Sequence, residues 1–314
     1  MNPINRRLFL RLTATSSFAA GLAAWETDSA LGIEPIKRSG PPRLRVGLVA
    51  YSLRDYFIDS SHPRSKTAPA SPRIDMLQFI DYCVEQGCQG AELTGYYFPP
   101  EVSDDYLMQV KRHAFLSGVE ISGTSVGNDF SLPLGEKRDA QIASVKRWVD
   151  HAQVLGAPYL RVFAGDPKGS SVAERKSLCV AALEECAEYA GRKGVMLGLE
   201  DHGGIVAEAD DMIEVIRAVK SPWLGVNLDV GNFRTDDPYA DLAKCAPYAI
   251  NVHWKTELRR RNQKENEQAD LARLIKLLRD ANYQGFVSLE YENQEDPLKA
   301  VPTILKRTKE LIAE

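Results

Sequence analysis

The stretch "LGVNLDVGN" at residues 224–232 carries an asparagine and an aspartate two positions apart in an apolar run that ends at a glycine. Such a run predicts a buried strand. Side chains two apart on a strand share a face, so Asn227 and Asp229 point the same way. A carboxylate removed from water destabilises the fold unless it has a partner, and Asp229 therefore requires one.

Seven further runs of this kind surround it along the chain. The eight predicted strands are residues 44–50, 88–93, 119–124, 158–163, 195–200, 224–229, 249–254 and 285–290. Segments with helical spacing separate several of them, and several of these end in glycine, a usual signal at the end of a helix. Eight strands alternating with helices predict a parallel sheet, and eight is the number that closes as a (β/α)₈ TIM barrel. A doubly wound open sheet is the alternative.

Acidic and imidazole side chains stand at or near the ends of four consecutive predicted strands. They are Glu200, Asp229, His253 and Glu290. In a barrel these strand ends form one ring at the carboxyl-terminal mouth, where barrel enzymes carry their chemistry, whereas in an open sheet they spread along an edge. The placement favours the closed barrel.

Three carboxylates and one imidazole converging from neighbouring strands would repel one another without a cation. Together they form a nitrogen and oxygen ligand set that suits Mn²⁺, Mg²⁺, Co²⁺ or Zn²⁺. Each residue alone has an ordinary reading, because a strand-end aspartate is often a helix cap and a histidine in a strand is often a core residue. The four in order predict a divalent metal site, with the metal as the partner of Asp229.

The chain from about residue 43 to 310 resembles the xylose isomerase-like TIM barrel superfamily, often labelled sugar phosphate isomerases/epimerases. The matching motifs are "LGLEDHGG", "VNLDVGN", "NVHWK" and "VSLEYE", with support from "GAEL" and "RVFAG". The resemblance implies that Glu200, Asp229, His253 and Glu290 are the metal ligands. It implies a sugar substrate without specifying which one.

Two positions depart from the pattern of many relatives. Where they carry a histidine three residues after the strand-six aspartate, this chain has Asn232. Asparagine donates and accepts hydrogen bonds but cannot carry charge or shuttle a proton. After His253 the chain keeps Lys255 but lacks the acid that often follows it.

The site suits proton transfer next to a carbonyl group, with Glu200 and Glu290 as acid and base on opposite sides of an enediolate. Five further residues are predicted to bind substrate: Glu92, Arg161, His202, Asn232 and Lys255. Structural roles compete with this reading. His202 could cap a loop, and Arg161 could pair with a strand-end acid such as Glu200.

Three functions fit these residues. The first is a metal-dependent isomerase or epimerase of a sugar or keto-sugar. The second is a lyase or dehydratase acting on a keto-sugar, keto-glycoside or inosose, in which the enediolate expels an oxygen substituent; the missing histidine favours it. The third is a non-catalytic carbohydrate-binding barrel, disfavoured because all four ligand positions are filled. No Gly-rich phosphate loop occurs, so an unphosphorylated sugar is expected.

Composition excludes other classes. The 314 residues include 44% hydrophobic and 26% charged residues with a net charge of -4, and therefore give no basic excess for nucleic acid. The basic stretch at 257–267 is balanced by its own acids and is expected to be a solvated loop or helix start. Five histidines are too few for the related DNA-repair endonucleases that use several zinc ions. The oligomeric state stays open, and a homo-oligomer is one option.

The N-terminus departs from the rest of the chain. Arg6 and Arg7 precede a mildly apolar, alanine-rich stretch without an acid before Glu26. This resembles a twin-arginine export signal and is too weakly hydrophobic for a stable membrane span. We expect residues 1–30 to be a signal segment, 31–42 a linker and 43–314 the barrel, in a protein exported to the periplasm.

Overall fold

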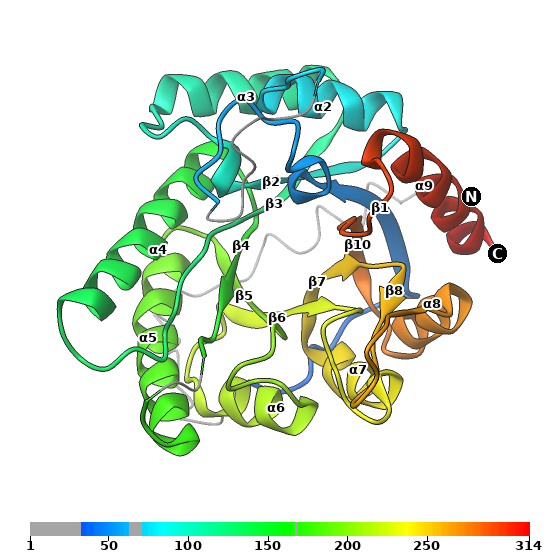
Figure 1. Ribbon diagram of the computed structural model, residues 1–314. Helices are drawn as coiled ribbons and strands as arrows, with labels where there is room; N and C mark the ends of the chain where they lie inside the picture. Colours follow the sequence, from blue (N-terminus) through cyan, green and yellow to red (C-terminus); the bar gives the residue numbers. More distant parts are fainter. Residues whose placement is uncertain (1–32, 63–70, 167–168) are drawn as a thin grey trace, which may run out of the picture. The chain divides into compact units, whose positions relative to one another are not determined.

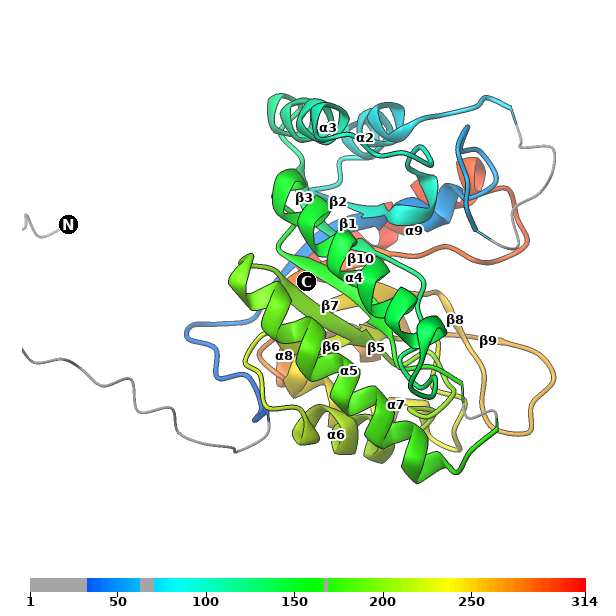
Figure 2. The same cartoon turned by 90° about the vertical axis from the view of Figure 1, so that its left-hand side faces the viewer.

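The computed structural model describes residues 33–62, 71–166 and 169–314. The expected signal segment, residues 1–30, lies outside the described residues, as do the first two residues of the expected linker. Residues 33–42 have no regular structure. They lie against the amino-terminal end of the barrel, where Ile36 N donates to Pro247 O at 2.9 Å and the Gln284 side chain donates to Ser39 O at 2.8 Å (Figure 2).

The described residues contain a closed barrel of eight parallel strands (Figure 1). Around the barrel the order is β1, β10, β7, β6, β5, β4, β3 and β2, so the first and last barrel strands pair. The strands are β1 (Arg43–Val49), β2 (Gly90–Thr94), β3 (Glu120–Ser125), β4 (Tyr159–Phe163), β5 (Met196–Glu200), β6 (Leu224–Asp229), β7 (Ala249–Trp254) and β10 (Gln284–Leu289). The predicted TIM barrel is confirmed.

Helices surround the strands on the outside of the barrel (Figure 1). They are α2 (Met76–Glu85), α3 (Asp104–Leu116), α4 (Glu136–Leu155), α5 (Val172–Arg192), α6 (Ala209–Ala218), α7 (Pro238–Cys245), α8 (Leu271–Asp280) and α9 (Pro297–Ala313), with short 3₁₀ turns η1 (Ala50–Leu53), η2 (Gly95–Tyr97) and η3 (Ala246–Tyr248). Several of these begin at a Ser or Asp N-cap whose side chain accepts a backbone hydrogen bond near the helix start, as in Ser103 of α3 and Asp270 of α8. Within the described ranges, no helix is long and apolar enough to cross a membrane.

A short hairpin after β7 is the main departure from the sequence prediction. The sequence predicts a solvated loop or helix start for residues 257–267, but the ends of this stretch pair as β8 (Glu257–Leu258) and β9 (Glu267–Gln268). Figure 2 shows this hairpin at the end of the barrel opposite residues 33–42. It therefore forms part of the wall around the carboxyl-terminal mouth.

A glycine makes room for a large side chain inside the barrel. A Cβ atom on Gly123 of β3 would lie 2.1 Å from the ring of Tyr159 on β4. Because real Cβ contacts are never so short, only glycine fits there. The space lets the Tyr159 hydroxyl reach Glu92 on β2, a fully buried carboxylate directly below the mouth.

Candidate metal centre

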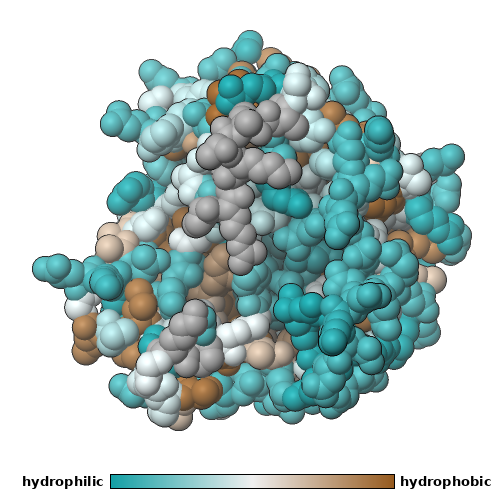
Figure 3. All heavy atoms as spheres, viewed as in Figure 1, coloured by the Kyte–Doolittle hydropathy of each residue, from teal (hydrophilic) through white to brown (hydrophobic). Residues whose placement is uncertain are grey.

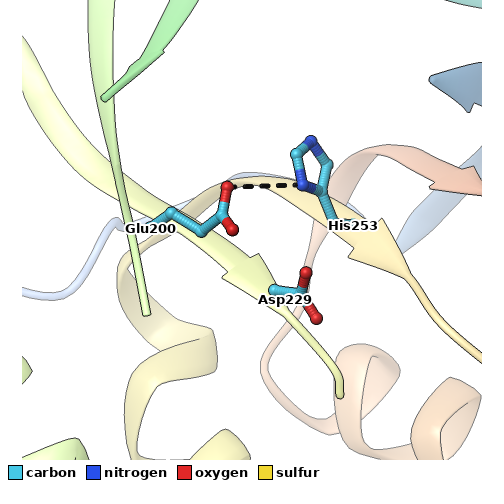
Figure 4. Close-up of side chains that lie close together, drawn as sticks. All are labelled: Glu200, Asp229 and His253. Atoms are coloured by element: carbon cyan, nitrogen blue, oxygen red, sulfur yellow. Dashed lines mark ion pairs between the residues drawn. The ribbon is translucent and has the colours of Figure 1, made fainter. Parts of the chain in front are cut away.

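Three side chains from neighbouring strands come together at the carboxyl-terminal mouth (Figure 4). Glu200 ends β5, Asp229 ends β6 and His253 lies on β7, where it pairs in register with Asp229. One ligand atom from each lies within 4.8 Å of the other two, and all three residues are buried. The alternation of the strands brings these groups together as the sequence predicts.

Glu92 fixes which nitrogen of His253 faces the other two residues. The Nε2 atom lies 2.8 Å from Glu92 Oε1, and Nδ1 lies 3.6 Å from Glu200 Oε2. Burial opposes ionisation of Glu92, but His253 and the Tyr159 hydroxyl lower its pKa overall. An ionised carboxylate can only accept, so Nε2 carries a proton and donates to Glu92. Burial would lower the pKa of His253, but Glu92 and Glu290 raise it to about 10, so a metal would bind Nδ1 in place of the proton held there. A carboxylate behind a ligating histidine is a common arrangement in metal sites.

Glu290 joins this group from the residue after β10. Its backbone N donates to Trp254 O at 3.0 Å, which continues the ladder beyond the strand. Its Oε2 lies 3.6 Å from His253 Nδ1. Glu200 and Glu290 thus approach the same imidazole nitrogen from two strands that have β6 and β7 between them.

Lys255 supplies a positive charge inside the cluster. Its Nζ lies 2.9 Å from Asp229 Oδ2, 3.4 Å from Glu290 Oε2 and 2.8 Å from Glu292 Oε2. Burial would lower the pKa of Lys255, but the three carboxylates, Asp229 first among them, raise it well above its usual value. Lys255 is therefore a fixed cation beside Asp229.

Arg161 and Asn232 hold Glu200. The Arg161 Nε lies 3.0 Å from Glu200 Oε2, and the Asn232 side-chain amide donates to Glu200 Oε1 at 3.1 Å. Lys255 in turn donates to the Asn232 side-chain oxygen at 3.2 Å. Burial raises the pKa of Glu200, while Arg161 and His253 oppose that rise. Asn232 thus connects Glu200 to Lys255, and Lys255 in turn contacts Asp229 and Glu290.

The acids have cationic side chains as partners without a metal, since Arg161 pairs with Glu200, as the alternative reading of the sequence proposed, and Lys255 pairs with Asp229 and Glu290. The donor set nevertheless fits an ion. Two carboxylates and an imidazole nitrogen converge on one point. Asp229 Oδ2 is buried and accepts no hydrogen bond of proper geometry from any described residue, even from Lys255. Glu200, Asp229 and His253, with Glu290 as a fourth ligand, would hold a hard or borderline divalent cation.

The residues predicted to bind substrate lie at different depths. Lys255 and Asn232 lie at the edge of the centre, where they also line a cavity. Arg161 has the structural role of pairing with Glu200, and Glu92 is completely buried behind His253. His202 is exposed and its ring lies 4.4 Å from that of Phe163. The sequence analysis placed His202 two residues after Glu200, but strand β5 ends at Glu200, so strand alternation does not put the two side chains on one face.

Three residues of the cluster were missed by sequence reasoning. Tyr159 binds Glu92, Glu292 pairs with Lys255, and Asp201 accepts a hydrogen bond from Asp229 N at 2.7 Å. Burial, followed by the nearby Asp229, raises the pKa of Asp201 well above its usual value. Glu292 carried a usable signal, because it stands two residues after Glu290 in "LEYE".

Glu92→Gln is expected to weaken metal binding by about 10–100-fold, the usual effect of losing the carboxylate behind a ligating histidine. A glutamine in that place offers one acceptor oxygen where Glu92 serves His253, Tyr159 and Asn251. The measurement is calorimetric titration of Mn²⁺ into the metal-free protein. Glu120→Gln, on an exposed glutamate at the start of β3, is the matched control. Equal affinities for Mn²⁺ in the two variants would show that Glu92 does not support metal binding.

Comparison with known proteins agrees with this fold. Residues 80–311 match the family model for the xylose isomerase-like TIM barrel. A xylose isomerase domain protein from Planctomyces limnophilus has a TM-score of 0.66 at 19% identity, over 86% of this chain and 98% of that one. The 3-keto-D-glucoside 4-epimerase of E. coli has a TM-score of 0.64 at 18% identity, over 85% and 100%.

A third similar structure belongs to another reaction class. The probable 3-DHS dehydratase from Bacillus anthracis has a TM-score of 0.60 at 18% identity, over 86% of this chain and 99% of that one. No curated protein matches the chain. At these identities the structures show a shared fold, and the family model covers most of the sequence. The chain belongs to the xylose isomerase-like TIM barrel family.

Proposed function

We propose that the protein is a divalent-metal-dependent isomerase or epimerase of a keto-sugar. One observation carries the proposal: Glu200 and Glu290 each place a carboxylate oxygen 3.6 Å from His253 Nδ1, although they come from strands on either side of β6 and β7. Two carboxylates around one point can serve the two faces of a bound substrate. The family and its sugar-epimerase neighbours support the same class of reaction.

The reaction divides between the two glutamates. One carboxylate removes the proton from the carbon next to the substrate carbonyl, and an enediolate results. The other, in its protonated form, returns a proton to carbon, which gives the epimer or the isomer. When bound, a divalent ion supplies Lewis-acid stabilisation of the negative charge that develops on oxygen. The Asn232 amide, which lines the cavity and donates one hydrogen to Glu200, can donate its other hydrogen to a substrate hydroxyl group.

Elimination on the same site is the second candidate. Asn232 occupies the place where many relatives have histidine, and it is already held between Glu200 and Lys255. An amide cannot act as an additional proton carrier, so return of the proton to carbon depends on the two glutamates alone. If no proton reaches the enediolate carbon, the protonated glutamate can instead assist the departure of an oxygen substituent.

Proton NMR in D₂O tests both candidates with the metal-loaded full chain. The substrates are D-fructose, D-psicose, D-tagatose and a 3-keto-glucoside. Epimerisation is expected to place deuterium at the carbon next to the carbonyl and to yield the epimer without loss of a leaving group. A new vinyl signal would assign the protein to the lyases. If no substrate shows either change, the proposed chemistry is wrong.

A further inference from the structure

A cavity of about 1300 Å³ opens beside the candidate metal centre. Asn232 and Lys255 line it, and the hairpin that contains β8 and β9, the loop after β10 and the helix α9 complete its wall. In Figure 3, viewed toward the mouth, hydrophilic residues cover the part of the surface formed by this hairpin and its neighbours. The cavity exceeds the range of about 300–1,000 Å³ that suits small-molecule sites, so it has space for more than the reacting part of a sugar.

Two arginines face this cavity from different segments. Arg234 belongs to the connection between β6 and α7, and Arg259 belongs to the hairpin. The backbone holds the two segments side by side, because Arg261 N donates to Thr235 O at 2.9 Å. Burial and then the positive charge of Arg259 lower the pKa of Arg234, which agrees with their proximity.

The other two arginines of these segments have acidic partners. Arg260 Nε lies 2.9 Å from Glu267, and Arg261 lies 2.7 Å from Glu208. Among the residues that the structure describes, no carboxylate lies within 4.0 Å of the guanidinium nitrogens of Arg234 or Arg259. The sequence analysis expected the acids within 257–267 to balance its basic residues. This is correct for Arg260, which pairs with Glu267, but not for Arg259.

The acids on the cavity wall are Glu257, Glu265, Glu292 and Glu295, and none of them lies within 4.0 Å of either guanidinium group. Glu257 accepts hydrogen bonds from Asn266 and Gln268, and Glu292 pairs with Lys255 at 2.8 Å. Glu292 is the only acid of the wall whose charge acts on Arg234 within the described residues, and Lys255 already shares it. Two neighbouring guanidinium groups repel each other unless an anion lies between them.

We propose that this cavity holds an anionic group of the substrate, a carboxylate or a phosphate, between Arg234 and Arg259. The planar guanidinium group binds both anions through two parallel hydrogen bonds. The substrate class is therefore an acidic keto-sugar. A carboxylate agrees with the expectation of an unphosphorylated sugar, whereas a phosphate would replace that expectation. Placement of the reacting carbons at the metal centre rests on the proposed function.

Calorimetric binding of three sugars to the metal-loaded chain at fixed ionic strength tests the proposal. D-fructose is neutral, D-fructuronate carries a carboxylate and D-fructose 6-phosphate carries a phosphate. At least one anionic sugar is expected to bind about tenfold or more tightly than D-fructose, the effect of one or two charge-assisted hydrogen bonds. The tighter of the two anions identifies the group.

The double variant Arg234→Gln/Arg259→Gln is expected to bind all three sugars equally, with its affinity for D-fructose unchanged. Arg260→Gln is the matched control, since this arginine lies on the same hairpin but has Glu267 as partner. Equal binding of neutral and anionic sugars by the wild type would overturn the proposal. A preference for an anionic sugar that remains in the Arg234→Gln/Arg259→Gln variant would overturn it as well. Binding needs no turnover, so an arginine-dependent preference without proton exchange in D₂O would contradict only the proposed reaction.

Discussion

Glu200→Gln and Glu290→Gln are each expected to lower turnover by about 10²–10⁴-fold, the usual contribution of a general acid or base. Glutamine keeps the size of the side chain and one oxygen ligand but cannot accept the substrate proton. The measurement is the rate of conversion of whichever sugar the wild type processes, with metal content determined for each variant. Each variant loses the charge of a proposed ligand, so turnover is compared at Mn²⁺ concentrations that keep every variant loaded with metal.

The two variants should also differ from each other. The variant that lacks the base should no longer exchange the substrate proton with D₂O, while its partner should still exchange it and fail only in product formation. Glu120→Gln, on the exposed glutamate at the start of β3, is the matched control and should keep full activity. Full activity with bound metal in either catalytic variant would place the base elsewhere.

Asp229→Asn is expected to weaken metal binding by more than about 100-fold. Loss of a residue that only hydrogen-bonds to a ligand, such as Glu92, usually costs about 10–100-fold, and Asp229 is a proposed ligand itself. The substitution keeps the hydrogen bond that Asp229 Oδ1 accepts from Gly231 N at 2.9 Å, so it removes charge with little change in shape. An ion that binds only the native state stabilises it by about 2.7 kcal/mol at a hundredfold excess over Kd. Asp229→Asn should lose that gain.

The measurement is the difference in Tm with and without Mn²⁺, because the absolute Tm also reflects the lost Lys255 ion pair. Glu292→Gln provides the matched control, since it removes another carboxylate partner of Lys255 but no predicted ligand. A metal-dependent Tm shift is expected in the wild type and in Glu292→Gln, and not in Asp229→Asn. The same shift in all three proteins would rule out the metal site at Asp229.

The sequence predicted the barrel and the ends of its strands well. Each strand is a short apolar run that local composition identifies, and the alternation of side chains along β6 puts Asp229 and Asn227 on one face without any tertiary information. Because parallel strand ends meet at one mouth, the order of residues along the chain was sufficient to assign Glu200 and His253 to the same site.

The partners of these residues could not be predicted in the same way. Arg161 stands in the middle of β4, and Lys255 follows the end of β7; their pairing with Glu200 and Asp229 depends on the register between strands and on long, flexible side chains. Glu92 lies at a register shift between β2 and β3, and no pattern in the local sequence predicts this shift. The sequence therefore identified the acids of the site and offered Arg161 as a partner of Glu200, but it did not predict that Lys255 pairs with Asp229.

The pairing of β1 with β10 has a consequence for the order in which the protein becomes active. Residue Arg43 pairs with Gln284, so the barrel closes only after β10 has been synthesised. Until then β1 and β7 each keep an unpaired edge, which favours association with other chains. Glu290 follows β10 directly, so the same event that closes the barrel delivers the last acid to the site. A nascent chain that stops before β10 therefore lacks both the closed fold and one of its two proposed proton carriers.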